Sequence, residues 1–135
     1  MRRLRTYKLI LTDLRRFRRT VSSMQDTLFV YRPGFVEHGT TYFCPYSAQV
    51  IGFLTYYPAV RATLELVELG FEKPRRPLVD LLGEAHQAAP MLVLGGPPAT
   101  VQGVQVRESG GRHYVEKTLE ILRYLAVTRG VPVPH

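Results

Sequence analysis

The chain has 135 residues, of which 45% are hydrophobic and 21% are charged, and it contains a single cysteine. This length suits one domain built around one hydrophobic core. One cysteine excludes an internal disulfide framework, so nothing indicates secretion and we expect a protein of the reducing cytoplasm. No apolar run approaches the roughly 20 residues that a membrane-spanning helix needs.

The positive charge of the chain is concentrated at its N-terminus. The net charge is +7, and residues 1–23 hold eight basic residues and one acidic residue, whereas residues 24–135 hold ten of each. Because nucleic-acid binding needs basic residues on the folded surface, we expect no nucleic-acid partner for residues 24–135. Three interpretations of this basic arm stay open: a surface-binding helix, a targeting peptide, or residues upstream of the true start at Met24. We favour the third and expect the arm to contribute little to the fold.

From residue 24 onward the sequence alternates between strand and helix patterns. Residues 27–31, Thr-Leu-Phe-Val-Tyr, are mostly β-branched or aromatic and predict a first strand that ends at a Pro-Gly turn. Residues 35–43 are expected to form a loop that leads to Cys44. Pro45 is well suited to the first position of a helix, and apolar residues then recur with helical spacing until Pro58 stops them.

The remaining elements complete an α/β domain. They are predicted strands over 63–69, 91–94 and 112–115 and predicted helices over 77–83 and 119–129. The strand 91–94 is wholly apolar and is expected to be central, whereas 112–115 is expected at an edge. Thr118 is predicted to cap the last helix. Residues 95–111 are rich in glycine and proline and are expected to form a long, variable loop.

This order of elements resembles the thioredoxin superfamily, and its glutaredoxin branch in particular, over residues 26–130. The residues that carry the resemblance are a Cys-Pro-Tyr-Ser turn that opens a helix, and Ala89-Pro90 before an apolar strand. The resemblance implies a thioredoxin-like single domain over residues 24–135, with a four-stranded mixed sheet flanked by helices and an antiparallel third strand. It also implies a cis peptide bond before Pro90, with the backbone of Ala89 facing the thiol.

A narrower resemblance concerns four short runs of the sequence. They are Tyr-Phe-Cys-Pro at 42–45, Tyr-Tyr-Pro at 56–58, Pro-Met-Leu-Val-Leu at 90–94 and Ile-Leu-Arg-Tyr-Leu-Ala at 121–126. Together they look like a bacterial family described only as a domain of unknown function. This family implies no activity.

The chemistry of Cys44 follows from its position at a helix start. Unpaired backbone N–H groups and the positive end of the helix dipole stabilise a thiolate over a thiol, which predicts a nucleophilic cysteine. Ser47 stands where a dithiol enzyme carries its resolving cysteine, and a serine cannot release a mixed disulfide by internal exchange. A second thiol must therefore come from another molecule. Glutathione or a protein disulfide is the partner that the resemblance implies.

Further residues are candidates for holding the partner. Ala89 and Pro90 would position the disulfide. In glutathione-binding relatives an acidic residue and a serine open the last helix, and Lys117 and Thr118 match those positions. Thr118 suits this role, whereas Lys117 has the wrong sign, and Glu116 is the nearest substitute.

Three other side chains are assigned to the surroundings of the thiol. Arg32 and His38 precede Cys44 and are expected to supply positive charge near the thiolate or to hold a peptide carboxylate. Tyr46 is expected to shield the sulfur or to stack on a ligand. The four histidines are separated by 48, 27 and 22 residues, which matches no local zinc or iron pattern, so no metal site is predicted.

Two functions follow from these residues. The first is a monothiol glutaredoxin-like protein with Cys44 as the nucleophile of thiol-disulfide exchange. The alternative is a non-catalytic binding or scaffold module with the same fold, in which Cys44 is a small hydrophobic residue and the arm or the 95–111 loop makes the contacts. The reactivity of Cys44 toward alkylating agents distinguishes the two.

Overall fold

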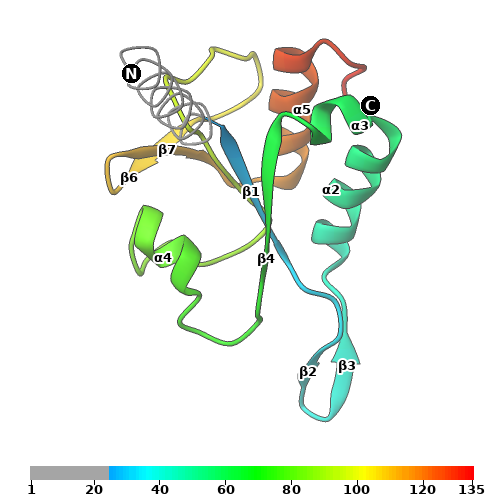
Figure 1. Ribbon diagram of the computed structural model, residues 1–135, viewed down its shortest axis with the longest axis vertical. Coiled ribbons are helices and arrows are strands. Elements are labelled where there is room, and N and C mark those ends of the chain that lie inside the picture. The colour runs from blue at the N-terminus through cyan, green and yellow to red at the C-terminus, as the bar shows by residue number, and fades with distance from the viewer. Residues whose placement is uncertain (1–24) are drawn as a thin grey trace, which may run out of the picture.

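A computed structural model of the chain describes residues 25–135, and the basic arm with Met24 lies outside the described residues. The strands are β1 Asp26–Tyr31, β2 Phe35–Glu37, β3 Thr40–Tyr42, β4 Leu64–Leu69, β5 Met91–Val93, β6 Arg107–Ser109 and β7 Arg112–Val115. The helices are α2 Pro45–Tyr56, α3 Pro58–Arg61, α4 Arg76–Leu82 and α5 Thr118–Arg129 (Figure 1).

Five strands form one mixed sheet in the order β4-β1-β5-β7-β6. Strands β1 and β4 are parallel and are connected through α2 and α3, as a parallel pair requires a crossover. The other neighbours in the sheet are antiparallel, with Leu28 of β1 opposite Leu66 of β4 on one side and Leu92 of β5 on the other. The apolar strand β5 lies in the middle of the sheet, as its composition predicted. The fold is therefore α/β, as expected.

The predicted number of four strands is wrong, because β6 forms within the stretch expected to be a loop. Strand β6 pairs with β7 through Glu108 opposite His113, so β7 is internal and β6 is the edge strand. The sequence of β6, Arg-Glu-Ser, contains no apolar residue and therefore no alternation of apolar and polar residues. Its side chains are exposed or half-buried. An edge strand of this kind is formed by backbone pairing and leaves little hydrophobic signal in the sequence.

The loop expected over residues 35–43 is instead a second, separate hairpin of β2 and β3. His38 and Gly39 form its two-residue turn with φ values of 52° and 78°. Positive φ at both positions gives the turn whose twist matches that of antiparallel strands. In Figure 1 the hairpin extends away from the sheet, at the end of the molecule opposite the chain's C-terminus.

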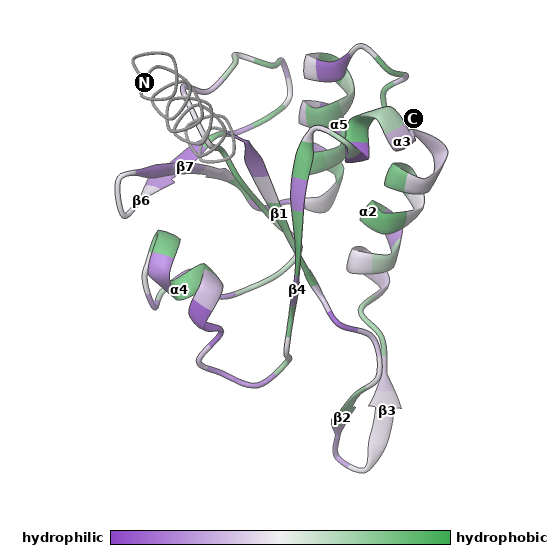
Figure 2. Cartoon of the chain, viewed as in Figure 1, coloured by the Kyte–Doolittle hydropathy of each residue, from purple (hydrophilic) through white to green (hydrophobic). Residues whose placement is uncertain are grey.

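Helices cover both faces of the sheet, and each face has its own hydrophobic core. Leu28 and Val30 of β1 point to the side of α2, α3 and α5, whereas Phe29 points to the side of α4. Figure 2 shows hydrophobic residues along the middle of β1, between these two layers. The period of two residues in a strand produces this alternation. Within residues 25–135, no helix has both the length and the apolar character that crossing a membrane requires.

The helix boundaries differ from the prediction at two points. Pro58 ends α2 as expected, but it also begins α3, because a proline is favoured at the first position of a helix. Thr118 is the first residue of α5 and not its cap, and Lys117 precedes the helix without a side-chain capping bond. The predicted helix 77–83 corresponds to α4, and Gly83 directly follows this helix at a φ of 93°.

Candidate functional site

Cys44 lies directly before the first turn of α2. Val50 and Leu54 anchor this helix on the sheet, and Pro45 is its first residue, as predicted. The backbone of Cys44 is extended, and its half-buried Sγ accepts a hydrogen bond from the backbone N–H of Ser47 at 3.4 Å. The sulfur thus takes the place of a capping oxygen at the helix N-terminus, where backbone N–H groups favour negative charge.

Ser47 is a structural residue of the same helix turn. Its side chain is 4% exposed, and its Oγ accepts a hydrogen bond from the backbone N–H of Tyr31 at 3.0 Å. This bond connects the start of α2 to the end of β1. The position that a resolving cysteine would occupy is therefore used to fix the helix that carries Cys44.

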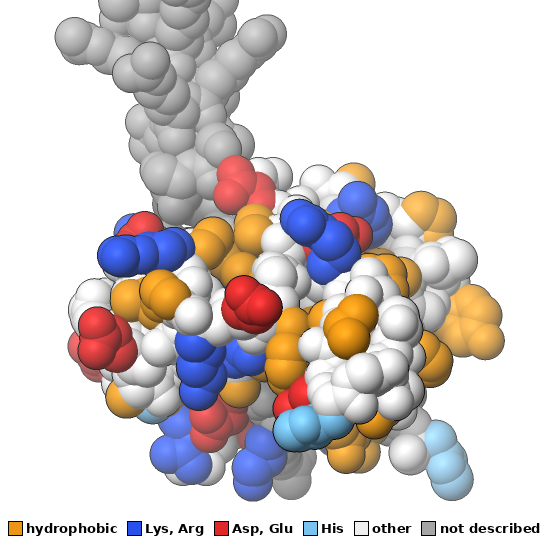
Figure 3. Space-filling model, turned by 90° about the horizontal axis from the view of Figure 1, so that it is seen from below, with side chains coloured by type: hydrophobic (Ala, Val, Ile, Leu, Met, Phe, Trp, Pro, Cys, Tyr) orange, Lys and Arg blue, Asp and Glu red, His pale blue; other side chains and the backbone are white. Residues whose placement is uncertain are grey.

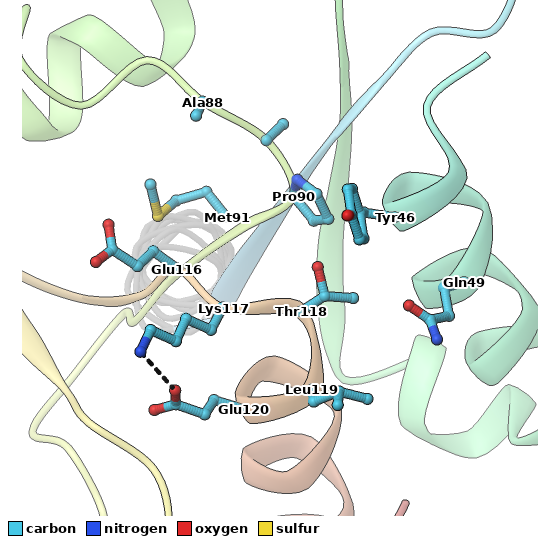
Figure 4. A pocket seen from close by; sticks show the side chains of 11 residues that line it. Tyr46, Gln49, Ala88, Pro90, Met91, Glu116, Lys117, Thr118, Leu119 and Glu120 are labelled. Atoms are coloured by element: carbon cyan, nitrogen blue, oxygen red, sulfur yellow. Dashed lines mark ion pairs between the residues drawn. The ribbon is translucent and has the colours of Figure 1, made fainter.

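A cavity of about 800 Å³ lies beside the start of α2 (Figure 4). Three segments form its walls: the first turns of α2, the approach to β5, and the start of α5. The lining residues are Tyr46, Gln49, Ala88, Ala89, Pro90, Met91, Glu116, Lys117, Thr118, Leu119 and Glu120. The fold thus brings the predicted site residues Tyr46, Ala89, Pro90 and Thr118 to one cavity, next to the helix turn that begins at Cys44.

The wall that contains Pro90 is held by residues that the sequence reasoning missed. The peptide bond between Ala89 and Pro90 is cis, as expected. The backbone N–H of Ala89 donates to the hydroxyl of Tyr31 at 3.2 Å. Arg75, only 8% exposed, lies over the Tyr31 ring at 4.8 Å and donates from Nη1 to the carbonyl of Gln87 at 2.8 Å. No sequence signal marks Arg75, because arginine is usually exposed.

The charged side chains at the cavity are paired with one another or with neighbouring residues. Glu116 forms an ion pair with Arg107 at 3.0 Å, and Lys117 lies 3.9 Å from Glu120. A carboxylate oxygen of Glu120 also accepts a hydrogen bond from the backbone N–H of Gln105 at 2.6 Å. Lys117, where the resemblance implies an acidic residue, therefore lies beside the carboxylate of Glu120 in the first turn of α5.

Arg32 and His38 do not line this cavity. Arg32 pairs with Glu68 at 3.6 Å, and both side chains are more than half exposed. His38 occupies the turn of the β2–β3 hairpin, which extends from the body of the molecule. Among residues 25–135 no group of three or more His, Cys, Asp or Glu side chains could hold a metal ion.

The face at the hairpin end of the molecule carries charges of both signs. Figure 3 shows Lys and Arg side chains interspersed with Asp and Glu, with hydrophobic side chains between them.

Exposed aromatic residues lie close to Cys44 in the sequence, since Phe43 and Tyr46 have exposed fractions of 62% and 60%. The surroundings of the thiol are thus aromatic and accessible.

Comparison with known proteins places the chain in a family. No curated protein and no solved structure matches it. A family model matches residues 25–133, that is, nearly all of the part that the structure describes. The chain belongs to the family of proteins of unknown function DUF3088, in line with the narrower of the two resemblances.

Proposed function

We propose that the chain is a thioredoxin-like protein of the glutaredoxin type, in which Cys44 is the nucleophile of a monothiol exchange reaction. The position of Cys44 carries the proposal. Its Sγ accepts a hydrogen bond from the N–H of Ser47 at the start of a 12-residue helix, and it is half-buried and not enclosed in the core. Such a site stabilises a thiolate and leaves it accessible.

The sheet supports the fold part of this proposal. Strands β4, β1, β5 and β7 follow one another in the sheet, with β1 and β4 parallel and β5 antiparallel to β1. This agrees with the mixed sheet and the antiparallel third strand that the resemblance implies. Strand β6 and the β2–β3 hairpin are then additions to that arrangement, one at the sheet edge and one directly before the cysteine.

The exchange consists of two balanced steps. The Cys44 thiolate attacks the glutathione sulfur of a mixed disulfide, a bond forms between that sulfur and Sγ, and the substrate sulfur leaves and takes up a proton. A glutathione thiolate then attacks the glutathione sulfur on Cys44, which forms oxidised glutathione and releases the Cys44 thiolate. The substrate is reduced to a thiol and glutathione is oxidised. Ser47 takes no part, because it has no thiol.

Alkylation and exchange measurements test this function. Native protein should react with iodoacetamide at Cys44, as mass spectrometry would detect, and should accelerate glutathione release from a glutathionylated peptide. Cys44→Ser should abolish both reactions. Serine is a good capping residue, so this variant should keep the start of α2 and a nearly unchanged melting temperature.

The same measurements decide between this function and a binding module. If Cys44 is alkylated only in denaturant, or if Cys44→Ser releases glutathione as fast as the native protein, the thiol is not a nucleophile. The alternative of a non-catalytic binding or scaffold module would then be favoured.

A further inference from the structure

The cavity beside α2 has walls that are held by buried side chains and by a backbone hydrogen bond. Met91 is 2% exposed and belongs to the central strand, and the adjacent Ala89 is held by the hydroxyl of Tyr31. The opposite wall is the first turn of α5, whose Ile121 is fully buried. A volume of about 800 Å³ lies in the range of roughly 300 to 1,000 Å³ typical of small-molecule sites.

The ionisable groups of the cavity are unfavourable to an anionic ligand. Two carboxylates, Glu116 and Glu120, and one ammonium group, that of Lys117, line the cavity. Lys117 lies 3.9 Å from Glu120, and the cation of Arg107 is held by Glu116 at 3.0 Å. A carboxylate of a ligand would have to compete for these cations with carboxylates that the protein already supplies.

The side chains that lack partners at the cavity are apolar or neutral. Tyr46 and Leu119 line it and have exposed fractions of 60% and 57%. The hydroxyl of Thr118 points toward Pro90 and Tyr46, and the amide of Gln49 lies on the facing helix (Figure 4). Within residues 25–135, the Thr118 hydroxyl and the Gln49 side-chain amide make no hydrogen bond to another protein group.

We infer that this cavity binds an uncharged, mainly apolar small molecule that carries a neutral hydrogen-bonding group. The apolar part covers Tyr46 and Leu119, whose burial supplies the binding energy, and Thr118 or Gln49 orients the polar group. This inference goes beyond the proposed function and does not use the thiol.

Two fluorescent probes with one ring system test the charge preference in the full chain. N-phenylnaphthylamine is uncharged and has one N–H group, and anilinonaphthalene sulfonate is the same ring system with an added anionic group. We expect saturable binding of one N-phenylnaphthylamine per chain, at least about tenfold tighter than binding of the sulfonate, which is a difference of about 1.4 kcal/mol. Absence of saturable binding, or equal affinity for both probes, overturns the inference.

Matched variants test the location of the bound probe. Tyr46→Ala and Leu119→Ala should each weaken N-phenylnaphthylamine binding about tenfold, because each removes apolar surface from the cavity. Their controls are Tyr56→Ala and Val127→Ala, since Tyr56 and Val127 lie on the same two helices, are 82% and 48% exposed, and do not line the cavity. A control that weakens binding as much as its partner variant overturns the assignment.

A third pair of variants separates this inference from the proposed function. Thr118→Val keeps the side-chain shape but removes the hydroxyl, and Gln49→Ala removes the amide. At least one of the two variants should weaken probe binding about threefold, because one of these groups bonds the N–H of the probe. If neither variant weakens binding, the inference is overturned. Cys44→Ser should bind the probe as the native protein does. Probe binding without alkylation of Cys44 would contradict the proposed function alone, and alkylation without probe binding would contradict this inference alone.

Discussion

The β2–β3 hairpin and the β6–β7 hairpin both reverse direction on two residues with positive φ. The turn is His38-Gly39 in the first hairpin and Gly110-Gly111 in the second. In each hairpin the residues directly before and after the turn pair with each other. Their surroundings differ. The β6–β7 hairpin extends the main sheet and reaches α4, whereas the β2–β3 hairpin forms a sheet of its own.

The contacts of the two hairpins explain which residues their turns accept. A Cβ atom at Gly110 would lie 2.7 Å from the carbonyl oxygen of Leu81, and the hydroxyl of Ser109 donates to the carbonyl of Leu82 at 2.7 Å. His38 at the equivalent place in the other turn is exposed. The same backbone turn therefore requires glycine where another helix approaches it, and accepts a larger residue where none does.

The largest expected effect comes from placing the same residue in both turns. Asparagine tolerates positive φ, so Gly110→Asn tests mainly the contact with Leu81 and should lower the free energy of unfolding by about 3 kcal/mol. His38→Asn, the matched change in the β2–β3 hairpin, should alter the free energy of unfolding by less than about 0.5 kcal/mol. Urea denaturation of both variants measures the difference. Equal effects would mean that the approach of α4 does not constrain the turn.

The next effect concerns the attachment of the β2–β3 hairpin to the rest of the domain. Phe35 stacks on Phe71 with ring centroids 4.2 Å apart and planes inclined by 7°. Phe35→Ala should lower the free energy of unfolding by about 2 kcal/mol, since it removes a half-buried aromatic pair. It should also speed hydrogen exchange of the Gly34 amide, which bonds the carbonyl of Tyr42 at 2.9 Å.

Val36→Ala is the control for this anchor. Val36 is the next residue of the same strand and is 65% exposed, so its truncation should leave both stability and exchange nearly unchanged. If Val36→Ala has the larger effect, the outward face of the hairpin is its point of attachment and Phe35 is not.

The smallest effect concerns one hydrogen bond between the β6–β7 hairpin and the end of α4. Ser109→Ala removes the donor to the carbonyl of Leu82 and should cost about 1 kcal/mol of unfolding free energy. Thr40→Ala places alanine beside the turn of the β2–β3 hairpin, where the side chain is exposed. It should lower the free energy of unfolding by less than about 0.5 kcal/mol. Thermal melts of the two variants would contradict the comparison if Thr40→Ala were the more destabilised.

The candidate site shows the same division between local and tertiary causes. The placement of Cys44 before a helix that begins at Pro45 could be predicted, because a proline at the first helical position is a local signal. The shared cavity of Tyr46, Pro90 and Thr118 could be expected only through the resemblance. The ion pair of Glu116 with Arg107 depends on the pairing of β6 with β7, and the position of His38 on a projecting turn depends on the pairing of β2 with β3.

The sequence by itself determined the elements whose pattern is local or strongly apolar. Helix α5 was predicted to within one residue and β5 was predicted to be central, because helical periodicity and a continuous apolar run reflect which faces are buried.

Only the tertiary structure decided the position of β6 at the edge of the sheet and the burial of Arg75. These features depend on backbone pairing and on contacts between distant segments, such as the bond from Ala89 to Tyr31, residues 58 positions apart. Such contacts leave no period in the sequence, because their energy comes from groups that meet only when the chain has folded.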